Sequence, residues 1–147
     1  MADIRTFLTQ DHRECDVHFS AMENIANAGT LADATEMYKK FAEATEHHFQ
    51  MEERVMFPAF EQKTGMLQGP TQMMRQEHTQ IRGLINEISE AIEADDRDKF
   101  FGLTETMMIM LQQHNMKEEQ MLYSMAQQHL NADAALIIDM MESMITE

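Results

Sequence analysis

Apolar side chains recur every three or four residues over four long stretches of the chain, a spacing typical of amphipathic helices. Short breaks at Gly29-Thr30, Gly65 and Asp95-Asp96 separate these stretches with residues that end or begin helices. The pattern predicts helices over residues 3–27, 31–62, 70–93 and 97–128, followed by a short helix over 132–145. Pro58 lies inside the second helix, where it is expected to kink or shorten the last turns.

The composition favours a wholly helical chain. Only 5 glycines and 2 prolines occur among 147 residues, while Ala, Leu, Met, Glu and Gln, which are good helix formers, are plentiful. This length suits one self-sufficient core, so residues 1–147 are expected to form a single domain. Four long helices with short connections predict an all-α, up-down-up-down four-helix bundle with a short C-terminal helix.

The net charge and the cysteine content indicate which partners and which cellular compartment to expect. The 11 Lys and Arg and the 26 Asp and Glu give a net charge of −15, which disfavours nucleic acid and anionic membranes as partners. Cys15 is the only cysteine, so an intramolecular disulfide is excluded and a cytoplasmic setting is expected. Neither a signal peptide nor a spanning segment of roughly 18 to 20 apolar residues is apparent, so we expect an unprocessed chain without membrane association. No motif predicts the oligomeric state.

The histidines repeat between the two halves of the chain. His12 and His48 are separated by 36 residues, and so are His78 and His114. The second histidine of each pair begins a His-x-x-x-Glu run that ends at Glu52 or Glu118. All three positions of the first half recur 66 residues later, although few other positions are identical at that offset. The halves therefore agree mainly at residue types that bind metals.

These residues are expected to point into the bundle. A separation of four residues places His48 and Glu52 within about 40° on one helical face, and that face is also the apolar one. Buried histidines and carboxylates are costly unless they are paired or bound to metal. We therefore predict two divalent ions held by six residues: His12, His48, Glu52, His78, His114 and Glu118. Imidazole and carboxylate ligands suit iron, with Mn and Zn as alternatives.

A lone histidine followed by His-x-x-x-Glu, the whole repeated over four helices, resembles the hemerythrin-like, or HHE cation-binding, family. The resemblance covers residues from about 4 to 128. It implies a non-haem di-iron centre in which the four histidines are terminal ligands and the two glutamates are bridging ones. A bridging oxo or hydroxo group, or water, would complete the site.

The sequence departs from the oxygen-carrying hemerythrins at two positions. Those proteins have a fifth histidine one turn before the third-helix ligand and an Asp five residues after the last histidine, where this chain has Met74 and Glu119. The ligand pattern resembles more closely the branch that repairs iron-sulfur clusters after nitrosative or oxidative stress. That branch often carries an N-terminal Cys-containing segment that this sequence lacks.

Three functions remain open from the sequence. The first is a di-iron protein that binds or senses O2 or a related small molecule such as NO or peroxide. The second is a stress-response di-iron protein that detoxifies peroxide or NO or repairs iron-sulfur centres, so whether the chain is an enzyme stays undecided. The third is a metal-free helical interaction module with an acidic surface. Four methionines are expected to line an apolar cavity beside the metals: Met107, Met110, Met121 and Met125.

Overall fold

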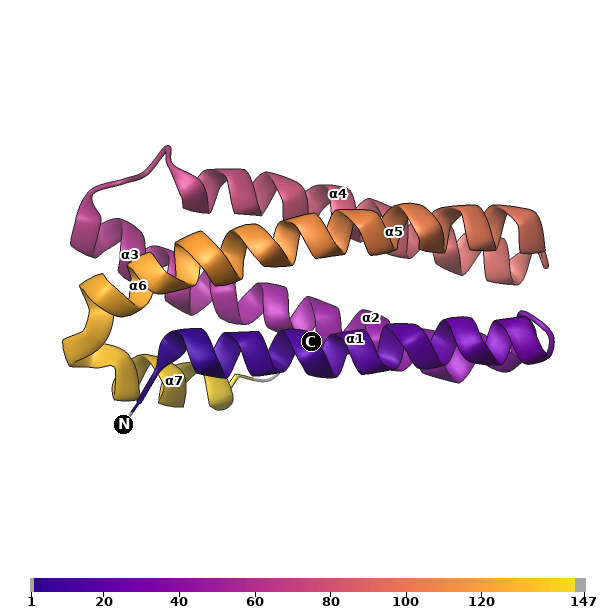
Figure 1. Cartoon of the computed structure of the whole chain (residues 1–147), viewed down its shortest axis with the longest axis horizontal. Helices are drawn as coiled ribbons and strands as arrows, with labels where there is room; N and C mark the ends of the chain where they lie inside the picture. Colours follow the sequence, from indigo (N-terminus) through magenta and orange to yellow (C-terminus); the bar gives the residue numbers. More distant parts are fainter. Residues whose placement is uncertain (1, 145–147) are drawn as a thin grey trace.

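The computed structural model describes residues 2–144, in which helices run antiparallel to one another and no strand occurs (Figure 1). The long helices are α1 (Ile4–Ala28), α2 (Thr35–Met51), α4 (Pro70–Glu93) and α5 (Arg97–Lys117). Two shorter helices, α3 (Phe57–Thr64) and α6 (Tyr123–Leu130), continue α2 and α5. The predicted all-α, up-down-up-down bundle is confirmed.

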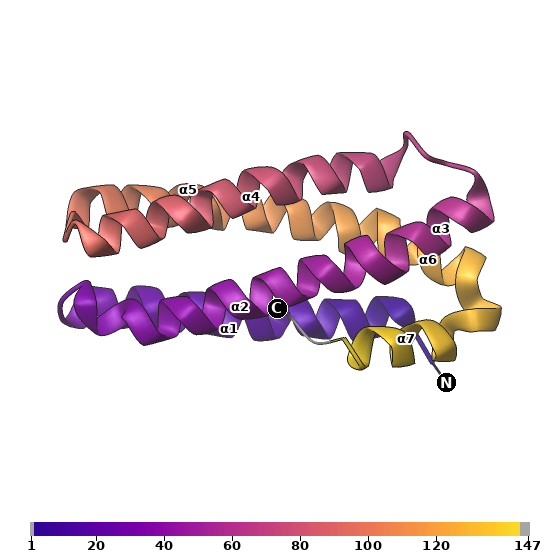
Figure 2. The same cartoon turned by 180° about the vertical axis from the view of Figure 1, so that it is seen from behind.

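The last helix, α7 (Ala134–Glu142), turns back and packs beside α1, as Figure 2 shows from behind. A 3-10 turn at Asn131–Asp133 precedes it, and another at Ala32–Ala34 precedes α2. The helix expected over 132–145 thus ends at Glu142, and its expected last residue lies outside the described range. No helix in residues 2–144 combines the length and apolar character needed to cross a membrane.

Side chains of the expected types define the helix ends. The carboxylate of Asp3 accepts a hydrogen bond from the backbone N–H of Thr6 at 3.0 Å, and Asp96 accepts one from Lys99 at 3.1 Å. Each bond satisfies a backbone donor that the first turn of a helix leaves without a partner. Gly65 ends α3 in the left-handed conformation, with φ of 76°, which glycine adopts without steric cost.

Two π-helical segments interrupt the long helices. They span Glu52–Met56 and Glu118–Leu122, so each begins at the glutamate of a His-x-x-x-Glu run. The backbone N–H of Phe57 bonds to the carbonyl of Glu52, and that of Tyr123 bonds to the carbonyl of Glu118. The fifth residue after each glutamate, rather than the fourth, is therefore stacked above it. The change of register precedes Pro58, which lies in the first turn of α3.

The hydrophobic core consists of two clusters with a polar layer between them. One cluster joins Ile4 and Leu8 to the buried side chains of α3, α6 and α7. The other joins Phe19 and Phe41 to α4 and α5 at the opposite end of the bundle. Between them lie the six predicted ligand residues, none of which is more than 4% exposed. The fold therefore holds ionisable side chains at its centre.

Candidate metal centre

The structure brings all six predicted residues together in two adjoining donor groups. His12 and His48 form the first group with Glu52 and Glu118, and His78 and His114 form the second with the same two glutamates. Within each group the potential ligand atoms lie no more than 4.8 Å from one another. Each of the four long helices, α1, α2, α4 and α5, contributes one histidine, so the arrangement depends on the whole bundle.

The two glutamates are shared between the groups. One oxygen of Glu52 lies 3.5 Å from Nε2 of His48, and its other oxygen lies 3.1 Å from Nε2 of His78. Oε1 of Glu118 lies 3.0 Å from Nε2 of His12 and 3.1 Å from Nε2 of His114. Both carboxylates therefore face a histidine of each group, Glu52 through its two different oxygens and Glu118 through Oε1 alone.

A carboxylate holds the outer nitrogen of every histidine in the site. The Nδ1 atoms of His12 and His78 lie 2.8 and 2.6 Å from Glu119 and Glu53. Those of His48 and His114 lie 2.7 Å from Asp11 and Glu77. A carboxylate that accepts the Nδ1 proton fixes the ring orientation and leaves Nε2 directed inward as a ligand atom.

Sequence reasoning missed these four outer carboxylates, although a signal for them was present. Glu53 and Glu119 are identical at the offset of 66 residues, and Asp11 and Glu77 are both acidic at the same offset. The first pair directly follows the shared glutamates, and the second directly precedes His12 and His78. The internal repeat therefore includes the residues that orient the candidate ligands as well as the candidate ligands themselves.

Tyr123 is a further residue of the site that the sequence did not reveal. Its hydroxyl lies 2.6 Å from Oε2 of Glu52 and 3.1 Å from Oε1 of Glu118. The same oxygen lies 3.1 Å from Nε2 of His12 and of His48. A continuous α-helix would place residue 122 nearest to Glu118, whereas the π segment places Tyr123 there.

Several inward atoms are buried without hydrogen bonds. Among residues 2–144, these include one oxygen of each shared glutamate and Nε2 of both His78 and His114. Buried polar atoms in native proteins nearly always have partners, so a set of orphaned atoms facing one another fits a bound ion. The donor set, imidazole nitrogen with carboxylate oxygen, is also one that divalent transition metals accept.

Comparison with protein families gives a match to the hemerythrin HHE cation-binding domain over residues 3–126. The chain belongs to this family. Comparisons with curated proteins and with solved structures found no match. The matched range contains both donor groups, all four outer carboxylates and Tyr123, so the hemerythrin-like domain includes the complete candidate centre.

The electrostatics of the hemerythrin-like site favour positive charge at its centre. Burial alone would lower the pKa of His48, but Glu52 and Asp11 raise it well above its usual value. Burial would likewise lower the pKa of His114, but neighbouring carboxylates, Glu118 above all, raise it to about 9. Burial would raise the pKa of Glu52, but His48 beside it holds that pKa well below the usual range. Protons can thus supply the positive charge that a metal would otherwise bring.

A small cavity adjoins the first donor group. Its volume is about 10 Å³, close to the space for one water molecule, and its wall includes His12, Cys15, Thr45 and His48. The hydroxyl of Thr45 is buried without a hydrogen-bond partner in the described part of the chain. Burial raises the pKa of the Cys15 thiol to about 11, so the thiol is neutral. The cavity is therefore small and holds the neutral thiol of Cys15 beside the hydroxyl of Thr45.

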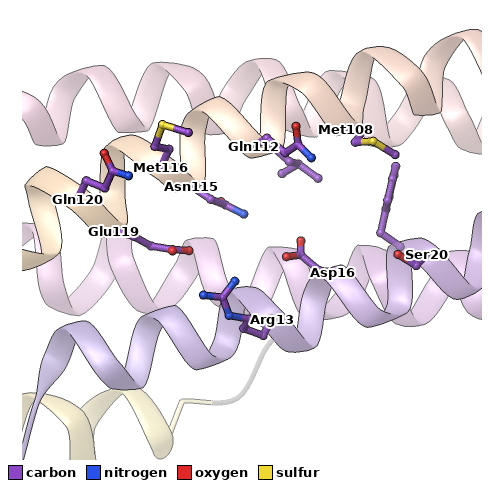
Figure 3. Close-up of a pocket in the computed structure, with 11 residues that line it drawn as sticks. Arg13, Asp16, Ser20, Met108, Gln112, Asn115, Met116, Glu119 and Gln120 are labelled. Atoms are coloured by element: carbon purple, nitrogen blue, oxygen red, sulfur yellow. The ribbon is translucent and has the colours of Figure 1, made fainter.

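A larger groove lies outside this cavity, between α1 and α5. It has a volume of about 520 Å³, and Arg13 and Asp16 of α1 line it opposite Asn115 of α5 (Figure 3). Three residues line both spaces and separate them: Asp16, Leu111 and Asn115. A displacement of these side chains would connect the groove to the donor group.

The predicted methionine lining is wrong for this cavity. None of the four expected methionines is in its wall. Met107 packs in the core, and Met121 is 61% exposed because the π segment rotates it away from the ligand face. Met74, at the place of a fifth histidine, is buried in the apolar cluster beside α3 and α6.

Removing the charge of an outer carboxylate should weaken metal binding. We expect Glu53→Gln and Glu119→Gln each to lower the affinity by roughly 10- to 100-fold, because the histidine they orient becomes a weaker, less fixed ligand. Competition with a chromogenic chelator measures the affinity. Glu105→Gln, on the exposed face of α5, is the matched control. Equal affinities for all three variants would contradict the assigned role.

The raised histidine pKa values predict how the metal-free protein responds to pH. The pKa of His114 is raised from 6.5 to about 9. Its contribution to stability is therefore fully present below pH 6.5 and is lost as the pH rises through 9. We expect the free energy of unfolding to fall by about 3 kcal/mol over that interval. Urea denaturation at several pH values measures it.

His114→Gln should flatten this decline, and a wild-type stability that rises over the same interval would refute the prediction. Metal affinity should change in the opposite direction, increasing with pH, because protons cease to compete for Nε2.

Proposed function

We propose that this hemerythrin-like chain is a non-haem di-iron protein that binds or senses O2 or a related small molecule, such as NO or peroxide. The observation that carries the proposal is the pair of donor groups sharing Glu52 and Glu118. Two carboxylates placed between four inward imidazoles match the needs of two adjacent ions better than those of one ion or of none.

Iron is proposed over Zn because a redox-active ion with nitrogen and oxygen ligands supplies electrons and an open binding position to small oxidants, and Mn, which shares this property, is the alternative. The chain's own residues would prepare that chemistry. The outer carboxylates hold the imidazoles in one tautomer, and the shared glutamates balance the charge. Phe49, whose ring stacks on His78 with centroids 3.9 Å apart, keeps water from the second group.

The size of the cavity supports a small ligand. A space of about 10 Å³ beside His12 and His48 accommodates a diatomic molecule only after slight expansion and excludes an organic substrate. The groove between α1 and α5 would supply the ligand through the layer formed by Leu111 and Asn115. Cys15, a lone cysteine, is consistent with the cytoplasmic setting that we propose.

A second function, peroxide or NO detoxification or repair of iron-sulfur centres under stress, is favoured by Met74. This side chain lies in an apolar cluster and outside both donor groups, so the ion near His78 would have no ligand from that position. An ion with fewer protein ligands has more positions at which chemistry can occur. Turnover of peroxide or NO by the iron-loaded protein would favour this function over reversible binding.

Metal analysis combined with optical spectra tests the proposal. We expect two iron ions per chain after reconstitution, and a visible absorption change when the reduced protein meets O2 or NO. His48→Ala and His114→Ala should each lower the iron content, because each removes a donor from a different group. His18→Ala, on α1 outside both groups, is the control. Protein that takes up no iron under these conditions would refute the proposal and favour a metal-free interaction module.

The hydroxyl of Thr45 should retain a small ligand in the cavity. We expect Thr45→Val, which keeps the shape of the side chain, to raise the dissociation rate constant for NO by about tenfold, the loss of one hydrogen bond of about 1.4 kcal/mol. Stopped-flow spectroscopy measures this rate. Thr104→Val removes an equally buried hydroxyl whose hydrogen bond goes to the carbonyl of Phe101, and it should leave the rate unchanged. Identical rates for both variants would exclude a role for Thr45.

A further inference from the structure

The hydroxyl of Tyr123 occupies the space that the first donor group surrounds. Its oxygen lies between 2.6 and 3.1 Å from an inward atom of each of the four residues in that group. The side chain is fully buried. Protein ligands hold transition metals at about 2 Å, so an ion bound by the same four residues would lie within bonding reach of this oxygen. No other hydroxyl in residues 2–144 has comparable contacts with the site.

The second donor group has a ring in the equivalent place but no oxygen. Phe57 precedes Tyr123 by 66 residues, the offset that relates the two halves of the site. Each residue follows its glutamate by five positions, and a π segment places each of them. The ring of Phe57 stacks on that of His78 with centroids 5.7 Å apart and an interplanar angle of 16°. The ring of Tyr123 stacks on that of His12 with centroids 5.5 Å apart and an interplanar angle of 27°. The half-sites match at this position except for one oxygen atom.

We propose that Tyr123 is a protein ligand of the ion held by His12 and His48, and that Phe57 leaves the ion held by His78 and His114 without a corresponding ligand. This proposal rests on the proposed di-iron function. As the ion binds, the O–H bond of Tyr123 breaks, its proton leaves to solvent, and the phenolate oxygen donates an electron pair to the metal. The hydrogen bond that Tyr123 donates to Glu52 would be lost with that proton.

The consequence is that the two metal positions differ in charge and in ligand number. The first would have two imidazoles, a phenolate and the shared carboxylates, whereas the second lacks the phenolate. An anionic oxygen favours the more highly charged state of the ion beside it, because the attraction grows with the charge. The ion at the His12 position should therefore be the more readily oxidised of the two.

Optical and Raman spectra of the Fe(III)-loaded full chain test the proposal. Tyrosinate bound to Fe(III) gives a broad visible charge-transfer band, and excitation into that band enhances tyrosine ring vibrations. We expect both signals in the wild type and their loss in Tyr123→Phe with iron still bound. Tyr38 is the only other tyrosine, and its hydroxyl donates to the carbonyl of Ile85, so Tyr38→Phe should keep both signals.

Phe57→Tyr extends the test to the second position and does not require Tyr123→Phe to fold. It should add a second tyrosinate signal, and the exchange variant Phe57→Tyr/Tyr123→Phe should recover the signal that Tyr123→Phe loses. Wild-type protein that contains two iron ions without a tyrosinate signal would overturn this proposal and leave the di-iron function standing. Protein that binds no iron would overturn both.

Discussion

The structure depends on a layer of ionisable side chains whose burial in an apolar core is unfavourable by itself. Four histidines and two glutamates cross the centre of the bundle, nearly inaccessible to water. Buried charges cost several kcal/mol each unless opposite charges and hydrogen bonds compensate them. Here a carboxylate holds each imidazole from outside, and the shared glutamates face it from inside. Positive charge must complete the layer, so membership of a cation-binding family is consistent with the physics of its core.

The same layer explains why the helices change geometry where they do. Each shared glutamate must lie one turn beyond its histidine, which an α-helix provides, and the next inward residue must then be a large ring. The π segments provide that ring five residues later, and they bury Phe57 and Tyr123 completely. The apolar clusters on either side of the layer join the long helices that carry it. The packing at both ends of the bundle therefore fixes the positions of the candidate ligands.

Periodicity and spacing were sufficient to predict the fold class and to bring together the six candidate ligands. They were sufficient because an unbroken α-helical register joins His48 to Glu52 and His114 to Glu118. Beyond Glu118 that register fails, so Tyr123 was missed and Met121 was placed on the wrong face. The outer carboxylates were missed for a different reason. Glu53 and Asp11 orient histidines on other helices, and pairings between helices cannot be read from one helix at a time.

The internal repeat also shows where the two halves of the site differ. Met74 is the counterpart of Leu8 at the offset of 66 residues, and both lie in one apolar cluster, so the absence of a fifth histidine preserves the symmetry of the ligand set. Departures from symmetry occur elsewhere. Cys15 and Thr45 line the cavity where the other half has Ile81 and Leu111, and Tyr123 stands where the other half has Phe57. These three departures adjoin His12 and His48, whereas Phe49, whose counterpart is Asn115, stacks on His78, so the two halves build one frame whose two half-sites have different surroundings.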